Sequence, residues 1–149
     1  MHEIRYDLRN LLLTYAPAGD FEVTTHVTFT PLKDFEHAAM YVWQDGQNYI
    51  KFATVHDGGH HLEIGVERRG KYERSLHANT IGHDVHLQVR KRGDVYRFFA
   101  SGGGERWREI GEPVELELID LRIGLAATAP KSQAQREAVF HHITFKEAD

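Results

Sequence analysis

Apolar and polar residues alternate along most of this chain, which is the spacing of β-strands rather than of helices. The clearest run covers residues 21–29, where every second position carries an apolar or β-branched side chain. Its apolar positions are Phe21, Val23, Val27 and Phe29, and its polar positions are Glu22, Thr24, His26 and Thr28. Because alternate side chains of a strand point to opposite faces, this run predicts a strand with one buried and one outward face.

Short turn motifs separate the alternating runs. Asp45-Gly46 lies between the runs 38–44 and 48–55, and Asp-Gly in this position is a strong hairpin signal. Further strands are predicted over 61–68, 72–77, 85–89, 95–101, 106–110, 121–127 and 139–145, and a surface loop over the polar segment 130–136. Regularly spaced short strands are typical of an all-β sandwich or barrel. No linker or repeat divides the chain, so we expect a single domain over residues 1–149.

The composition fits a folded domain and excludes several kinds of partner. Of 149 residues, 41% are hydrophobic and 27% are charged, and 18 Lys and Arg against 22 Asp and Glu give a net charge of -4. Because the sequence has no basic stripe, neither nucleic acid nor an anionic membrane is an expected partner. Apolar runs are a few residues long, far below the roughly 20 of a membrane-spanning helix.

The chain has no cysteine, so no disulfide framework is expected. Residues 1–5 lack the basic and apolar segments of a signal peptide. Two locations stay open: cytoplasmic for the chain as sequenced, and extracellular if the chain is a module of a secreted enzyme.

Several blocks of the sequence resemble a known family of sandwich domains. The blocks are Asp20-Phe21-Glu22-Val23-Thr24-Thr25, residues 35–39, Tyr41-Val42-Trp43-Gln44-Asp45, residues 48–51, 87–89, Gly93-Asp94, 98–101, Trp107, 123–126 and 138–140. Together they resemble the concanavalin A-like domains at the C-terminus of bacterial β-xylosidases and arabinofuranosidases, over roughly residues 10–146. Ala39 and Gly103 depart from the usual Gly and Asp of that pattern. The resemblance implies a two-sheet antiparallel jelly-roll sandwich and a carbohydrate context.

Catalysis of the glucanase kind is not expected. Glycoside hydrolysis requires two carboxyl groups about 5–9.5 Å apart. The laminarinase-type glucanases of this superfamily carry several carboxylates on one strand, but the matching strand here, residues 48–53, has none. Glu63 and Glu67 on the next strand face one way, and we interpret them as part of a solvated strand face.

An outward face rich in aromatic and polar side chains is the candidate site. Sugars stack their C–H faces on aromatic rings and receive hydrogen bonds from charged and amide groups. If Met40, Val42, Ile50 and Phe52 point into the core, the residues between them point outward. The predicted carbohydrate-binding residues are Tyr41, Trp43, Tyr49, Lys51, His61, Glu63, His86, Gln88 and Arg90. This interpretation makes the chain a non-catalytic carbohydrate-binding or glycosidase-accessory module whose partner is a polysaccharide or oligosaccharide.

Two other interpretations stay open. Tyr49, Lys51, His86 and Arg90 are residue types that polysaccharide lyases use on this fold, where Arg holds a uronate and Tyr or His moves protons. Alternatively, Tyr41 and Trp43 pack under a loop or against another protein, and the chain is a structural domain that forms a homodimer or adjoins a catalytic domain.

No cofactor is expected, although the chain has 11 histidines. His56, His60 and His61 flank one turn and His83 and His86 lie near another, but none has the spacing of a zinc motif. His141 and His142 are adjacent on a predicted strand and are therefore expected to point to opposite faces. The resemblance makes a structural calcium ion a further option, but no group of loop oxygens fixes its position.

Overall fold

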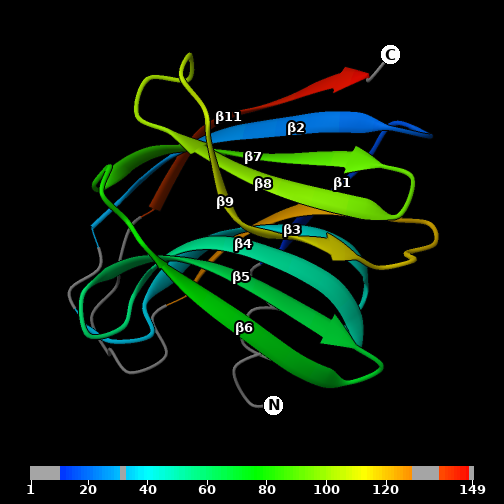
Figure 1. Ribbon diagram of the computed structural model, residues 1–149, viewed down its shortest axis with the longest axis horizontal. Helices are drawn as coiled ribbons and strands as arrows, with labels where there is room; N and C mark the ends of the chain where they lie inside the picture. The colour runs from blue at the N-terminus through cyan, green and yellow to red at the C-terminus, as the bar shows by residue number, and fades with distance from the viewer. Residues whose placement is uncertain (1–10, 31–32, 129–137, 148–149) are drawn as a thin grey trace.

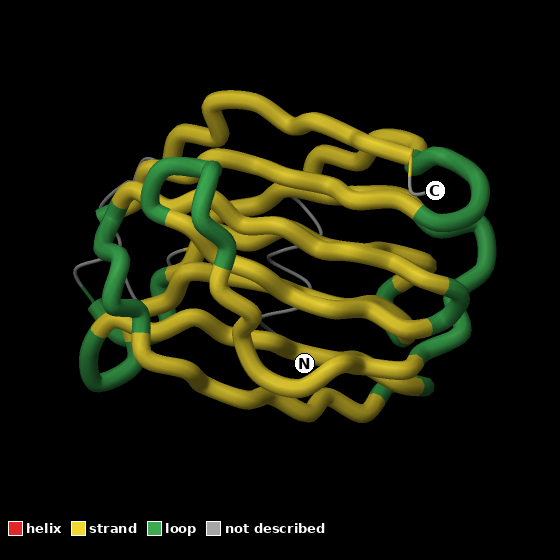
Figure 2. Tube along the Cα trace, turned by 45° about the horizontal axis from the view of Figure 1, so that its top comes forward, coloured by secondary structure: helices red, strands yellow, loops and turns green. Residues whose placement is uncertain are grey.

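The fold is an all-β sandwich of two antiparallel sheets, as the sequence predicts. A computed structural model describes residues 11–30, 33–128 and 138–147, which form eleven strands (Figures 1 and 2). The segment 130–136, predicted to be a loop, lies outside the described residues. Among the described residues there is no helix, and hence none that could cross a membrane.

The strands divide into two sheets that form the two layers of the molecule. The first sheet has the order β1 (Leu12–Tyr15), β10 (Arg122–Thr128), β3 (His37–Asp45), β4 (Asn48–His56), β5 (His60–Arg68) and β6 (Lys71–Ala78). The second sheet has the order β11 (Ala138–Glu147), β2 (Phe21–Phe29), β7 (Asp84–Arg92), β8 (Val95–Ser101) and β9 (Arg108–Glu115). In Figure 1, β2, β7 and β8 lie above β4, β5 and β6.

The main core lies between the two sheets. The alternating apolar positions of the central strands all face it, and the rings of Phe52 on β4 and Phe98 on β8 meet edge to face with centroids 5.4 Å apart. Both side chains are fully buried. Burial of such side chains is the dominant stabilising contribution, so the period of two in the sequence determines which side of each sheet turns inward.

The hairpin between β3 and β4 forms where Asp45-Gly46 predicts it. The carboxylate of Asp45 accepts hydrogen bonds from the backbone N–H of Gln47 at 2.9 Å and from the Asn48 side-chain amide at 3.2 Å. The Gln47 N–H, with smaller contributions from Gln44 and Asn48, lowers the pKa of Asp45. The turn therefore favours the ionised carboxylate and fixes the register between the two strands.

The edge strand β11 contains a bulge at two histidines. Phe140 pairs with Val27 and Ile143 with Thr25, so His141 and His142 together lie opposite one residue of β2, His26. An extra residue interrupts the alternation of a strand. The expectation that His141 and His142 point to opposite faces is therefore wrong: both rings lie near His26 on the outer side of the second sheet.

Candidate functional site

The nine predicted carbohydrate-binding residues do not form one surface. The core occupies the space between the sheets, so outward side chains of the two sheets lie on opposite sides of the molecule. The outer face of the first sheet carries Tyr41 and Trp43 from β3, Tyr49 and Lys51 from β4, and His61 and Glu63 from β5, whereas the outer face of the second sheet carries His86, Gln88 and Arg90 from β7.

The aromatic residues on the first face form a second hydrophobic cluster. The rings of Trp43 and Tyr49 stack with centroids 5.1 Å apart, and Tyr41 meets Tyr49 edge to face at 5.7 Å. Tyr72 from β6 packs against this cluster. Trp43 is 9% exposed, Tyr49 3% and Tyr41 2%. Side chains buried to this degree offer a sugar no ring face, so the packed alternative considered for Tyr41 and Trp43 fits them better.

The polar residues of the same face bind one another. Glu63 accepts a hydrogen bond from the Tyr72 hydroxyl at 2.5 Å and from Arg74 at 3.1 Å, and the ammonium of Lys51 lies 3.6 Å away. Arg74 also donates to Asp57 at 3.0 Å. Burial by itself raises the pKa of Glu63, but Lys51, Tyr72 and Arg74 together outweigh it, and the net shift is downward. Glu63 is thus an ionised, buried partner in a network.

The solvated-face interpretation of Glu63 and Glu67 is therefore wrong, because Glu63 is 3% and Glu67 1% exposed. Burial raises the pKa of Glu67. Neither carboxylate has the open surroundings that a glycosidic bond would need.

Gly65 explains how Tyr72 reaches Glu63. A Cβ atom at position 65 would lie 1.9 Å from the Tyr72 hydroxyl oxygen and 2.5 Å from the ring carbon that carries it. The Tyr72 side chain therefore crosses the first face through space that a side chain at Gly65 would fill.

The predicted residue His61, at the start of the same strand, has a different partner. It bonds through Nδ1 to the Gly59 carbonyl oxygen at 3.1 Å.

The outer face of the second sheet is built differently. The guanidinium of Arg90 lies over the ring of Phe99, 3.7 Å from its centroid. Its Nε donates to Gln88 Oε1 at 2.5 Å, and Gln88 in turn donates to the Thr24 hydroxyl at 3.0 Å. The ring and the amide fix the plane of the guanidinium, while 32% of the Arg90 side chain stays exposed.

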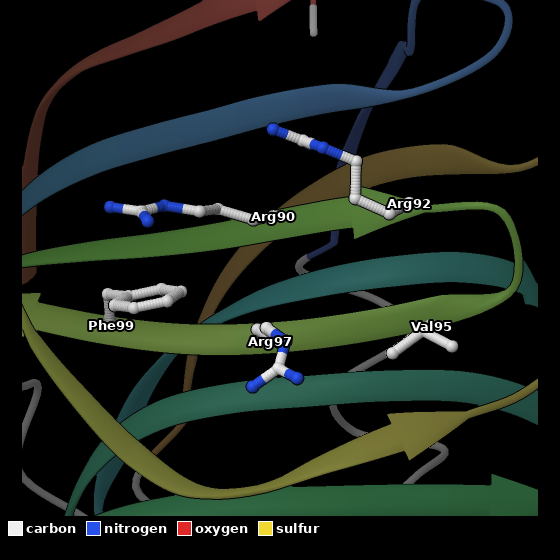
Figure 3. Close-up of a pocket in the computed structure, with 5 residues that line it drawn as sticks. All are labelled: Arg90, Arg92, Val95, Arg97 and Phe99. Carbon is white, nitrogen blue, oxygen red and sulfur yellow. The ribbon is translucent and has the colours of Figure 1, made fainter.

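A pocket opens beside Arg90 (Figure 3). It has a volume of about 190 Å³ and is lined by Arg90, Arg92, Val95, Arg97 and Phe99, the first two on β7 and the others on β8. Glu22 lies 3.8 Å from Arg90 and 3.5 Å from Arg92, and Arg97 pairs with Glu109 at 2.7 Å. Arg92 was not among the predicted site residues, although it lies two positions beyond Arg90 and shares its outward parity.

The lyase constellation is not assembled. Tyr49 and Lys51 lie on the outer face of the first sheet, and His86 and Arg90 on that of the second, with the core between them. Four residues on opposite sides of a sandwich cannot hold one uronate and move its proton.

Histidine rings gather at the other end of the second face. His26 on β2 stacks on His86 of β7 at 4.0 Å and on His141 of β11 at 4.2 Å between centroids. His26 Nε2 contacts the carboxylate of Asp84, which also accepts a hydrogen bond from Thr28 at 3.1 Å. Sequence reasoning missed this group because the residue pattern does not show that β2 lies between β7 and β11.

Exposed apolar side chains occur on the edge strand β1, where Leu12 is 77% and Tyr15 79% exposed. The homodimer and the neighbouring catalytic domain considered for this chain stay predictions, as do the calcium ion and the cellular location.

The two-sheet topology defines a concanavalin A-like sandwich domain. Residues 5–146 match the family described as the β-xylosidase C-terminal concanavalin A-like domain, and the chain belongs to that family. A search of curated proteins found no match.

Solved structures share the fold at low sequence identity. Xylan β-1,4-xylosidase from Bacillus halodurans is similar with a TM-score of 0.80 and 18% identity over 92% of this chain, and the chain spans 29% of that enzyme. A functionally unknown protein from Saccharomyces cerevisiae gives a TM-score of 0.78 and 18% identity over 93% of this chain and 73% of its own. The carbohydrate-binding module CBM66 from Bacillus subtilis gives 0.63 and 17%, covering 93% of this chain and 81% of the module.

Proposed function

We propose that this domain is a non-catalytic carbohydrate-binding accessory module and that its glycan binds on the outer face of the second sheet. The observation that carries the proposal is the pocket beside Arg90, where a partly exposed guanidinium is held flat on Phe99. Membership of a family of xylosidase C-terminal domains and the likeness to a carbohydrate-binding module support a carbohydrate ligand.

The second face suits this function better than the first. On the first face, Lys51 and Glu63 neutralise each other and the aromatic rings are covered. On the second face, Arg92 keeps 46% and Arg97 50% of the side chain exposed. A ligand can displace water from such groups without breaking a buried network, so binding there costs the fold little.

The chemistry of the pocket points to a sugar that carries a carboxylate. Three guanidinium groups face two carboxylates, those of Glu22 and Glu109, which leaves an excess of positive charge. A guanidinium presents a rigid fork of donors that fits a carboxylate and also bonds hydroxyls. A pocket of about 190 Å³ suits one sugar unit of a longer chain. We therefore expect a uronate-substituted polysaccharide to bind more tightly than its neutral counterpart.

Phe99 acts through Arg90 rather than on the sugar itself. The ring is 9% exposed and lies beneath the guanidinium. It is therefore a positioning residue, and the hydrogen bonds to the glycan come from Arg90 and its arginine neighbours.

The test is titration calorimetry against paired polysaccharides, such as a xylan with its glucuronate branches and the same xylan with the branches removed. We expect the native protein to favour the acidic xylan and Arg90→Ala to weaken binding about tenfold or more, the value of a hydrogen bond to a charged group. Arg108→Ala, which removes an exposed arginine of β9 that bonds Thr80, is the matched control and should leave affinity unchanged. Equal binding by Arg90→Ala, or no binding to either xylan, contradicts the proposal.

A further inference from the structure

A second group of side chains on the outer face of the second sheet has the geometry of a metal site. It comprises His26 on β2, Asp84 on β7 and His141 on β11, three adjacent strands. One donor atom from each residue lies within 4.8 Å of the other two. Ligand atoms around a tetrahedral ion are on the order of 3–4 Å apart, given metal–ligand bonds of about 2.0–2.2 Å. The three side chains are partly or fully exposed, so small rotations can bring their ligand atoms from within 4.8 Å of one another to the separation that an ion requires.

The donor set selects the class of ion. Two imidazoles and one carboxylate suit zinc and its first-row neighbours, whereas calcium and magnesium prefer sites made of oxygen atoms. Three protein ligands also leave a fourth position of a tetrahedral ion for water or another oxygen ligand.

The surroundings hold these side chains in place. The Thr28 hydroxyl lies 3.1 Å from the Asp84 carboxylate and 2.7 Å from His141 Nε2, so one side chain contacts two of the three residues and leaves His141 Nδ1 for the ion. His86 stacks on His26 at 4.0 Å and restrains its ring. Partners of this kind orient the ligands of protein metal sites.

The site is also open to an ion from solution. The Asp84 side chain is 64% exposed and that of His26 is 21% exposed. An ion can therefore enter without opening the core.

The pairing of β11 with β2 is the feature that completes the group. Two residues of β11, His141 and His142, occupy the place opposite His26. His141 follows Phe140, which pairs with Val27 and packs against the core. His141 therefore faces outward, and its ring lies against the His26 ring with centroids 4.2 Å apart.

We propose that His26, Asp84 and His141 bind one divalent transition-metal ion, Zn²⁺ in the first instance, and that the ion ties the edge strand β11 to β2 and β7. An ion that binds the native state alone raises Tm in proportion to the logarithm of its concentration. The proposal stands apart from glycan binding, because neither its residues nor its test involves the Arg90 pocket.

The test uses the untagged full chain, freed of metal by a chelator and then titrated with Zn²⁺ in a calorimeter. We expect one ion to bind per chain and Tm to rise. Zn²⁺ binding should weaken by about tenfold or more in each of three variants: His26→Ala, His141→Ala and the nearly isosteric Asp84→Asn. Removing a residue that merely hydrogen-bonds a metal ligand already costs about tenfold, so removing a ligand should cost at least as much. Co²⁺ in place of Zn²⁺ should give the intense visible absorption of a tetrahedral site in the native chain and lose it in these variants.

The matched control is His60→Ala. His60 belongs to a second group of rings, 4.6 Å from His83 and 5.5 Å from His56 between centroids. The His60→Ala substitution should leave Zn²⁺ affinity unchanged. The proposal is overturned if the native chain binds no Zn²⁺, or if the affinity stays the same in both His141→Ala and Asp84→Asn.

Discussion

Arg90 and Phe99 lie face to face on neighbouring strands of the second sheet, with the guanidinium carbon 3.7 Å from the ring centroid. They are not direct partners: Phe99 pairs with Gln88, two residues before Arg90, and Arg90 pairs with Arg97. The contact is therefore diagonal, which long and aromatic side chains can span. It holds a charged group at the surface in a fixed orientation.

If Phe99 positions Arg90, the two residues should be coupled in ligand binding. Phe99→Ala should weaken binding to the acidic xylan by about 1 kcal/mol, the worth of an exposed cation–π contact. Phe99→Ala combined with Arg90→Ala should be no weaker than Arg90→Ala alone. Calorimetric titration of the single and double variants measures this coupling, and additive losses would show that Phe99 contacts the glycan independently.

Trp43 should matter for stability and not for glycan binding. It is 9% exposed and stacks on Tyr49 in the cluster that covers the first sheet. Trp43→Ala should lower the free energy of unfolding by about 3–5 kcal/mol, as for other buried aromatic side chains. Urea denaturation measures the loss, and titration at a temperature where the variant is folded measures the affinity. If a folded Trp43→Ala protein no longer bound the glycan, the binding site would have to lie on the first face.

Glu63 should stabilise the fold in a pH-dependent way. Its pKa in the folded chain lies below the ordinary value of 4.5, so its stabilising contribution is present above pH 4.5 and is lost as the pH falls through the folded-state pKa. At pH 7, Glu63→Gln should lower the free energy of unfolding by about 3 kcal/mol, because it leaves Lys51 buried without its counter-charge.

Denaturant titrations of native protein and Glu63→Gln from pH 7 down to pH 3 provide the check. The difference between the two should shrink at the acid end. A difference independent of pH would mean that the Glu63 carboxylate is not held ionised by its partners.

The contribution of Glu67 to stability should depend on pH in the opposite direction to that of Glu63. Burial raises its folded-state pKa above 4.5, so its contribution is most favourable below pH 4.5 and is lost as the pH rises through the folded-state value. Glu67→Gln, which removes the charge and keeps the shape, should therefore stabilise the domain at pH 7 and change little at pH 4. Thermal melts at the two pH values test this. Destabilisation at pH 7 would contradict this sign.

Much of the fold follows from residue order alone. The alternation in 21–29 predicts both the bounds and the buried face of β2, and Asp45-Gly46 predicts the hairpin that joins β3 and β4. These features are local, since the period of a strand and the geometry of a two-residue turn depend on neighbours in the sequence.

The site was harder to predict because it depends on relations between distant strands. Alternation correctly turns Tyr49 and Arg90 away from the core, but it does not say that β4 and β7 belong to different sheets. Nor does it say that Tyr72 and its neighbours cover Tyr49. The histidine group was missed for the same reason, because its members come from β2, β7 and β11, and the residue pattern does not show that these strands are neighbours.

The most direct test of the glycan-binding proposal is to locate the bound glycan by NMR. Amide resonances of the ¹⁵N-labelled domain would be followed as acidic xylan oligosaccharides are added. The account predicts that shifts concentrate on β7 and β8 around Gln88, Arg90 and Arg97, and that those of Tyr41, Trp43 and Tyr49 stay in place. Shifts confined to β3 and β4 would contradict it and place the ligand on the first sheet.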